Sequence, residues 1–158
     1  MTEISKNAKV PQCDKTTVSG SVTVRDLRIG NCIKIKEDSF HFQEILQINR
    51  GSICIEEPIS DEFVCVDILD VEPIKISKEW LEKLGFKFVI RNMWELKIDF
   101  YTKLQFYENQ DDYITLFIQN YNNGERVSDT HLAMKNIKYI HQLQNLFFDL
   151  TGRDLTDR

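Results

Sequence analysis

The side chains best suited to catalysis or metal binding are the histidines and cysteines, and their spacing predicts neither chemistry. The three histidines are His41, His131 and His141. They show no HxxxH or HxH spacing and no adjacent cysteine, so a histidine-rich metal site is not indicated. A catalytic histidine also needs an orienting partner, and the sequence does not identify one. We therefore expect no catalytic residues, no metal and no cofactor.

The cysteines favour a reducing compartment. They are Cys13, Cys32, Cys54 and Cys65. They form no CxxC pair, and three of them lie in or beside predicted strands, where a buried free thiol behaves as a small apolar residue. No apolar run approaches the roughly 18 to 20 residues needed to span a bilayer, and the N-terminus lacks the apolar core of a secretory signal. We predict a cytoplasmic protein without a membrane partner; a disulfide is the alternative.

Negative charge is concentrated in the first half of the chain. The net charge is −5, and residues 20–76 carry six basic and eleven acidic side chains, which gives 6 − 11 = −5. The densest acidic patch contains Glu56, Glu57, Asp61 and Glu62. One interpretation is a solvated face that keeps strand edges soluble. The other is a partner-binding patch that docks on a basic surface, such as the nucleic-acid channel of a nuclease.

A second candidate site would bind RNA. Its residues are Arg25, Arg28, Lys34 and Lys36, with Phe40 and Phe42 to stack on bases. The alternative is ordinary alternation of Lys and Arg on a strand face. An acidic chain is a poor candidate for generic nucleic-acid binding, which depends on cationic side chains displacing counterions.

Two aromatic residues are candidates for contacts with a partner. Phe148 lies off the apolar stripe of the last predicted helix, and Tyr121 lies in an Asn-rich turn. Either the helix is buried on two sides or Phe148 marks an exposed contact for a second chain.

The last helix is the element that must organise the others. Residues 137–151 place a stripe of large apolar side chains on one arc of a helix with 3.6 residues per turn. The stripe consists of Tyr139, Ile140, Leu143, Leu146, Phe147 and Leu150. Asn136 is the predicted N-cap, and Gly152 provides the left-handed residue that ends the helix. The rest of the chain must supply a surface that this stripe covers.

The region before this helix predicts two lobes and a flexible arm. Residues 1–20 are polar and lack periodicity, which is typical of a flexible arm. Residues 21–76 contain short alternating strands separated by turns, which favours a meander curled into a small SH3-like β-barrel. Residues 77–158 predict a short helix between Ser77 and Gly85, an antiparallel sheet with a two-residue turn at Arg91-Asn92, and the long C-terminal helix. The predicted class is α+β, with both helices covering the second sheet.

Three segments resemble a family of small proteins carried by prophages and mobile elements of Bacteroidetes. They are Leu27-Arg-Ile-Gly-Asn, the linking segment 72–86, and the C-terminal segment 137–155, which includes His141-Gln-Leu-Gln-Asn-Leu-Phe-Phe. The resemblance covers roughly residues 24 to 155. The family has no established catalytic residues, so the resemblance implies a setting, a phage-derived protein inside a bacterium, rather than an activity.

Small non-enzymatic proteins in that setting often inhibit host defence, anti-CRISPR proteins among them. We therefore predict a phage-derived binding protein that inhibits a host defence system, with a CRISPR nuclease or its guide-RNA complex as the expected partner. The alternatives are an RNA-binding module and a structural or assembly accessory protein of the phage.

Overall fold

The computed structural model describes residues 22–36, 42–56, 62–107, 113–122, 125–134 and 137–156. The predicted arm of residues 1–20 lies outside these ranges. Eleven strands and two α-helices form in the described residues, and the strands belong to three sheets. The expected α+β class with a long final helix is therefore wrong, because the described chain is mostly β and its two helices are short.

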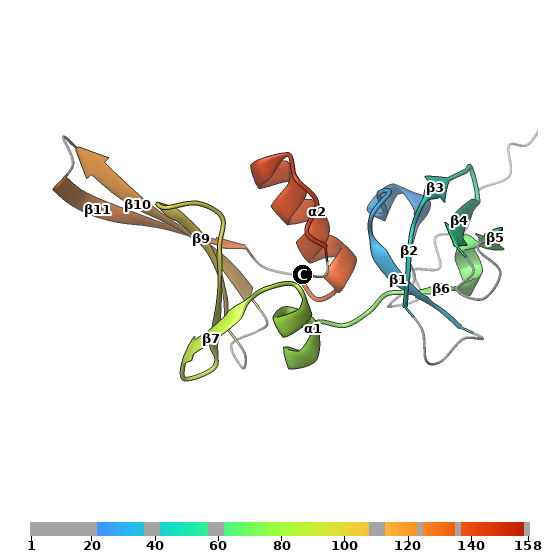
Figure 1. Ribbon diagram of the computed structural model, residues 1–158, viewed down its shortest axis with the longest axis horizontal. Helices are drawn as coiled ribbons and strands as arrows, with labels where there is room; N and C mark the ends of the chain where they lie inside the picture. Colours follow the sequence, from blue (N-terminus) through green and yellow to red (C-terminus); the bar gives the residue numbers. More distant parts are fainter. Residues whose placement is uncertain are drawn as a thin grey trace, which may run out of the picture.

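Two small sheets occupy the N-terminal half (Figure 1). One has the strand order β2-β1-β6 and the other β3-β4-β5, and both are antiparallel. Their strands are β1 (Cys32–Ile35), β2 (Phe42–Glu44), β3 (Gln47–Ile48), β4 (Ser52–Glu56), β5 (Phe63–Asp67) and β6 (Val71–Glu72). The inward-facing aliphatic residues of both sheets form one shared core, comprising Leu27, Ile33, Ile45, Ile53, Ile55 and Val71.

The predicted SH3-like barrel does not close. A barrel requires an unbroken ring of hydrogen-bonded strands, whereas β3 and β6 each contain two residues. Because these strands are so short, the two sheets pack on a shared core, but no ladder of hydrogen bonds between described strands joins them into a ring. Short 3₁₀ turns at Val24–Asp26 and Ile68–Asp70 complete this half.

The C-terminal half contains a five-stranded antiparallel sheet with the order β11-β10-β9-β8-β7. Its strands are β7 (Lys87–Ile90), β8 (Met93–Lys97), β9 (Thr102–Tyr107), β10 (Tyr113–Asn122) and β11 (Glu125–Met134). The two-residue turn predicted between β7 and β8 is confirmed: Arg91 and Asn92 both have positive φ, at 48° and 72°, as a type I′ hairpin requires. One face of the sheet contributes Trp94, Leu96, Leu104, Phe106, Ile114 and Leu116 to the larger core.

The first helix, α1 (Lys78–Lys83), has the predicted boundaries. The Ser77 hydroxyl accepts a hydrogen bond from the Trp80 amide at 3.4 Å. Gly85 has φ +83°, and the Phe86 amide donates to the Leu81 carbonyl at 2.9 Å. These are the N-cap and the Schellman-type ending expected from the sequence.

The last helix, α2 (Ile140–Thr151), begins three residues later than predicted. Residues Lys138 and Tyr139 are extended because they pair with the segment before α1. The Ile76 amide donates to the Lys138 carbonyl at 3.1 Å, and the Ile140 amide donates to the Ile74 carbonyl at 2.8 Å. Tyr139 is consequently the N-cap instead of Asn136. Gly152 ends the helix with φ +67°, as predicted.

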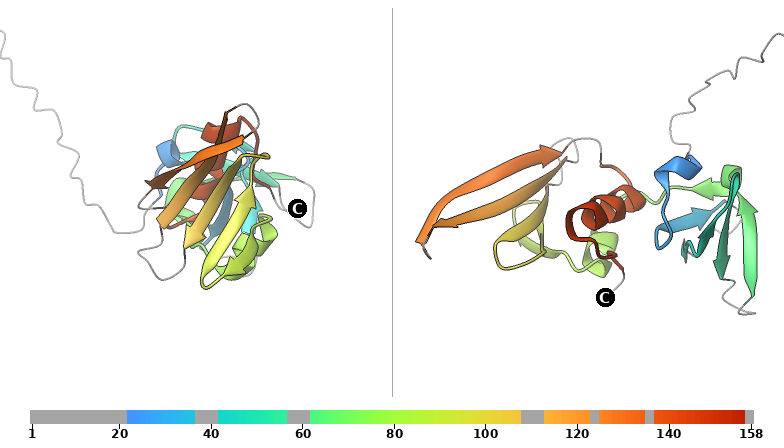
Figure 2. Two further views of the ribbon diagram at one scale, coloured as in Figure 1. Left: turned by 90° about the vertical axis from the view of Figure 1, so that its left-hand side faces the viewer. Right: turned by 90° about the horizontal axis from the view of Figure 1, so that it is seen from above.

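Helix α2 lies between the five-stranded sheet and the N-terminal sheets in two orthogonal views (Figures 1 and 2). Its apolar stripe packs on the five-stranded sheet with Ile140, Leu143 and Phe147, each at most 2% exposed. The opposite side faces β1. The helix is thus covered on two sides. Neither helix of the described residues combines the length and the apolar character needed to cross a bilayer.

Cys54 and Cys65 form a disulfide across the β4–β5 pair. The expectation of free thiols is therefore wrong for these two residues. The strand register places them directly opposite each other, which spacing in the sequence did not reveal. Cys32 is partly buried and not part of this disulfide, and its sulfur accepts a hydrogen bond from the Gln144 side chain at 3.5 Å.

Candidate protein-binding surface

The predicted acidic patch lies at one end of the β4–β5 pair. Glu56 is the last residue of β4, and Glu62 immediately precedes β5. Both are exposed. Glu57 and Asp61 lie outside the described residues. The strand register places Glu56 directly opposite Phe63, so an acidic and an aromatic side chain are neighbours on this surface.

Strand β5 presents an exposed aromatic residue next to these carboxylates. Val64 and Val66 lie opposite the buried Ile55 and Ile53 of β4, but only Val66 packs against the core, and Val64 is 37% exposed. Alternation along a strand then turns Phe63 outward, where 71% of its surface is exposed. Phe63 was not among the predicted contact residues, because the continuous apolar run of residues 63–66 does not reveal which side chains face solvent. An exposed phenylalanine beside acidic side chains is the kind of residue that anchors a protein–protein interface.

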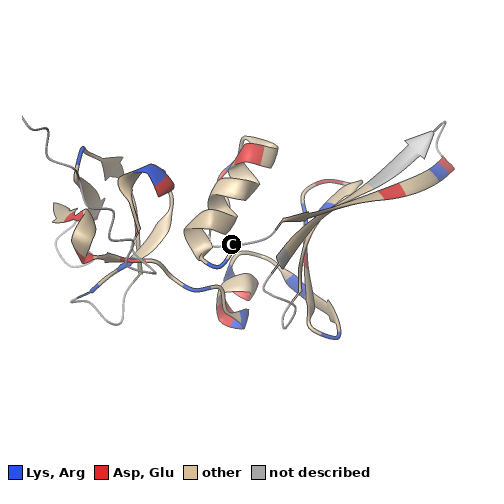
Figure 3. Cartoon of the chain, turned by 180° about the vertical axis from the view of Figure 1, so that it is seen from behind, with Lys and Arg blue, Asp and Glu red and all other residues tan. Residues whose placement is uncertain are grey.

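The turn after β5 lies at the other end of the β4–β5 pair, where Asp67 is opposite Ser52. The Asp67 carboxylate accepts a hydrogen bond from the Leu69 amide at 2.8 Å and so caps the 3₁₀ turn Ile68–Asp70. The turn leaves Leu69 72% exposed beside Asp70. We use "acidic face" for Glu56, Glu62, Phe63, Asp67, Leu69 and Asp70. Figure 3 shows the acidic positions of this half of the chain in red.

The acidic face also borders an open strand edge. In the order β3-β4-β5, the outer edge of β5 has no neighbouring strand among the described residues. Phe63 lies beside Glu56 and Glu62, whereas Leu69 lies beside Asp70 and accepts a hydrogen bond from Lys36 through its carbonyl. Exposed apolar groups among mainly acidic side chains suit a protein partner that offers an apolar depression within a basic rim. The same carboxylates would repel the phosphate backbone of a nucleic acid.

Arg28 and Phe148, which the sequence assigned to two different candidate sites, contact each other. The Arg28 guanidinium lies over the Phe148 ring at 3.4 Å from its centroid and 3.7 Å from the Asp154 carboxylate. Phe148 is partly buried by this contact. The structure thus follows the alternative in which α2 is covered on two sides. The side chain of Tyr121 lies outside the described part of the chain.

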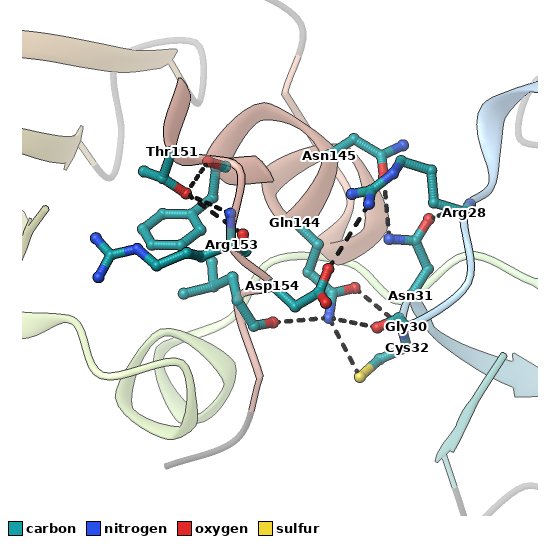
Figure 4. Close-up of polar contacts among 11 residues, drawn as sticks. Arg28, Gly30, Asn31, Cys32, Gln144, Asn145, Thr151, Arg153 and Asp154 are labelled. Carbon is teal, nitrogen blue, oxygen red and sulfur yellow. Dashed lines mark hydrogen bonds and ion pairs between the residues drawn. The ribbon is translucent and has the colours of Figure 1, made fainter. Parts of the chain in front are cut away.

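Arg28 also belongs to a polar joint that connects the two halves of the chain and includes Gln144, Asn145 and Asp154 (Figure 4). Gln144 is 3% exposed and lies at its centre. Its side-chain carbonyl accepts from the Cys32 amide at 2.9 Å, and its NH₂ group donates to the carbonyls of Leu155 at 3.0 Å and Gly30 at 3.3 Å.

Asn145 makes the neighbouring part of the joint. Its side-chain carbonyl accepts from the Asn31 NH₂ group at 3.0 Å, and its own NH₂ group donates to the Asp26 carbonyl at 2.9 Å. The Leu27–Asn31 segment and the C-terminal segment therefore meet in space. Their chemistry here is structural, because these bonds fix α2 against β1.

His141 is buried beside this joint. It is 3% exposed, its ring stacks parallel to that of Tyr139 at 5.8 Å, and its Nδ1 atom finds no hydrogen-bond partner among the described residues. Burial lowers the pKa of His141, and the Asp26 charge opposes this effect only in part. Burial of this kind favours the neutral form of the imidazole.

The predicted RNA-binding residues are dispersed. Arg28 belongs to the joint, the Lys36 ammonium donates to the Leu69 carbonyl, and Phe40 lies outside the described residues. Lys34 and Phe42 lie opposite each other on β1 and β2, whereas Arg25 is exposed on the first 3₁₀ turn.

Phe42 has contacts that the sequence did not predict. Its ring meets Trp80 of α1 edge to face at 4.5 Å, and the Lys83 ammonium lies 4.2 Å from its centroid. An aromatic pair with a lysine above it is thus formed where β2 meets α1. The sequence could not reveal it, because the residues lie on separate elements.

Among the described residues, no three His, Cys, Asp or Glu side chains lie close enough together to hold a metal ion. No protein-family model, curated protein or solved structure matches the chain. Of the predicted sites, the acidic patch is the one whose described residues, Glu56 and Glu62, are both exposed, and Phe63 between them adds an apolar anchor.

Proposed function

We propose that this is a phage-derived, non-enzymatic binding protein that inhibits a host defence system, with an RNA-guided effector nuclease as its target. The observation that carries the proposal is the acidic face, on which the exposed Phe63 ring lies directly opposite Glu56. The resemblance of the Leu27–Asn31 and C-terminal segments to prophage proteins supplies the setting.

The mechanism follows from charge. A nuclease that holds a guide and its target lines its channel with cationic side chains. An acidic face that occupies such a channel competes with the nucleic-acid backbone for the same cations. Phe63 and Leu69 add apolar contact area, which a phosphate backbone does not offer. This area would let the protein bind the channel in a way that the nucleic acid cannot.

The test is a binding assay with purified effector nucleases, with and without guide RNA, followed by a cleavage assay. We expect retention of the protein on one effector and loss of target cleavage. Glu56→Lys and Glu62→Lys together should weaken binding by at least tenfold, because each reversal replaces an attraction with a repulsion. Phe63→Ala should raise the dissociation rate.

Matched controls lie at other exposed positions. Glu82→Lys changes the same charge on the exposed side of α1, and Phe100→Ala removes a ring that is 78% exposed at the turn between β8 and β9. Both should leave binding unchanged. Absence of binding to every effector would reject the proposed target, and equal effects of test and control variants would reject the acidic face as the contact.

Single-stranded RNA is the second candidate ligand, and the group formed by Phe42, Trp80 and Lys83 favours it. Aromatic rings beside a cation are the usual means of holding unpaired bases. Binding of this kind should weaken steeply as salt rises, and Lys83→Glu should weaken it further. A flat titration with single-stranded RNA at low ionic strength would reject this candidate.

A further inference from the structure

Strand β11 is a long edge strand of the five-stranded sheet. It contains ten residues and stands last in the order β11-β10-β9-β8-β7, so within the described ranges no strand pairs with its outer edge. Strand β10 pairs with β9 only as far as Ile118. Beyond that point β10 and β11 form a two-stranded ribbon that projects from the body (Figure 1). Ribbons of two strands are marginally stable alone, and open edges of this length invite a further strand.

Strand β11 carries one pair of complementary side chains placed symmetrically about Thr130. Asp129 and His131 lie on the same face of the strand, one on each side of Thr130, and acidic and basic positions alternate toward the tip of the ribbon (Figure 3). Val127 and Leu132 are 65% and 52% exposed. A strand that carries complementary groups at equal distances from a central residue can pair with a copy of itself across a twofold axis.

We propose that two copies of the chain associate through antiparallel pairing of their β11 edges, with the twofold axis at Thr130. In this register Asp129 of each copy lies opposite His131 of the other. An imidazole donates a hydrogen bond to a carboxylate whether or not it is protonated. Val127 lies opposite Ala133, Ser128 opposite Leu132, and Arg126 opposite Met134. The pairing joins two five-stranded sheets into one continuous sheet with the helices of both copies on the same side.

Neighbouring registers are less favourable. An axis at Asp129 places two carboxylates opposite each other, and like charges in direct opposition destabilise a strand pair. An axis at His131 leaves Asp129 opposite Ala133, without a donor. The axis at Thr130 also uses the strand from Arg126 to Met134, almost its whole length. Asp129 already binds Arg126 of its own chain, with Nε donating at 3.0 Å, so its carboxylate is held ionised and in place.

A second copy fits this edge better than a nucleic acid or an unrelated basic surface. The described residues of β11 carry two acidic side chains, Glu125 and Asp129, and one arginine, Arg126. The strand therefore lacks the positive charge that a β-ribbon needs in a DNA groove. The pairing is independent of the acidic face, which lies in the other half of the chain.

Sedimentation of the full chain tests the proposal. We expect a particle of twice the 18.6 kDa of one chain. His131→Asp opposes two carboxylates at both symmetry-related positions and should weaken the dimer by roughly 10- to 100-fold. The exchange Asp129→His with His131→Asp reverses each pair and should restore the dimer. Restoration would exclude loss of folding as the cause of the single-variant effect.

Disulfide capture tests the register. In a Cys13→Ser, Cys32→Ser background, Thr130→Cys places two thiols at the axis, where opposing Cα atoms lie about 4.5 to 5.5 Å apart. Mild oxidation should give a covalent dimer that a reductant dissolves. Ser128→Cys is the matched control, because the two copies of this residue are offset by four residues, about 13 Å. It should remain uncrosslinked.

A chain that sediments as a monomer at all concentrations would overturn the proposal. So would a dimer that the charge variants leave unchanged, or one that Ser128→Cys captures as readily as Thr130→Cys. In each case the edge of β11 would serve another purpose or none.

Discussion

Replacing Gln144 with alanine should destabilise the protein more than any change on the exposed surface of the same helix. The Gln144 side chain is almost fully buried and bonds to the Cys32 amide and to the carbonyls of Leu155 and Gly30. Alanine leaves these backbone groups buried without the partner that they now have. An orphaned buried donor or acceptor costs about 1 to 3 kcal/mol.

The expected loss follows from two of these bonds. The Cys32 and Leu155 groups, at 2.9 and 3.0 Å from the side chain, give a total of about 2 to 6 kcal/mol. The longer bond to Gly30 is left out of the sum. Alanine has a higher helix propensity than glutamine, which recovers about 0.4 kcal/mol. We expect a net loss of about 3 kcal/mol, or a fall in melting temperature of roughly 6 to 12 °C for a chain of this size.

The assay is urea unfolding followed by circular dichroism and by tryptophan fluorescence. Asp149→Ala, at an exposed position of α2, is the control and should change stability by no more than about 0.5 kcal/mol. Gln144→Met keeps the side-chain volume but removes the hydrogen bonds, and it should lose nearly as much stability as Gln144→Ala. A loss below about 1 kcal/mol in both Gln144 variants would refute the view that the joint is held by these bonds.

Three further predictions concern the side chains around α2 and the disulfide. The pKa of His141 is lowered in the folded protein, so the unfolded chain binds the proton more readily. The free energy of unfolding should therefore fall as pH drops below about 6.5. In His141→Gln, the urea midpoint should change less between pH 7.5 and 5.5 than it does in the unaltered protein. Reduction of Cys54–Cys65, which closes a short loop of separation 11, should lower the unfolding free energy by about 2 to 3 kcal/mol; a Cys54→Ser, Cys65→Ser double variant should show no response to reductant. Arg28→Ala and Phe148→Ala, measured singly and together, should give a coupling energy of about 0.5 to 1 kcal/mol, and additive losses would contradict the stacking contact.

The local signals in the sequence were accurate where a segment controls its own conformation. Ser77 and Gly85 fix both ends of α1, and Gly152 ends α2, because a hydroxyl cap and a left-handed glycine act within one turn of the chain. The Arg91-Asn92 turn follows from its length alone.

The same signals failed where a distant segment decides the conformation. Residues Lys138 and Tyr139 have the period of a helix, but they pair with the strand segment at Lys75 instead, so α2 is shorter than its pattern. The closure of the N-terminal strands could not be judged from the sequence, since it depends on which strand edges meet. Burial of Gln144 and His141 on the second side of α2 was also hidden, because both residues look polar on a helical wheel.

The sequence by itself determined that this chain is β-rich in its first half, negatively charged there, and ended by an amphipathic helix that stops at Gly152. Tertiary structure alone decided that Arg28 stacks on Phe148, that Cys54 meets Cys65, and that Phe63 faces solvent beside Glu56. The physical reason is the distance along the chain between the residues that interact. Caps, turns and side-chain periodicity depend on neighbours a few residues apart, whereas exposure and pairing depend on which surfaces the whole chain brings together.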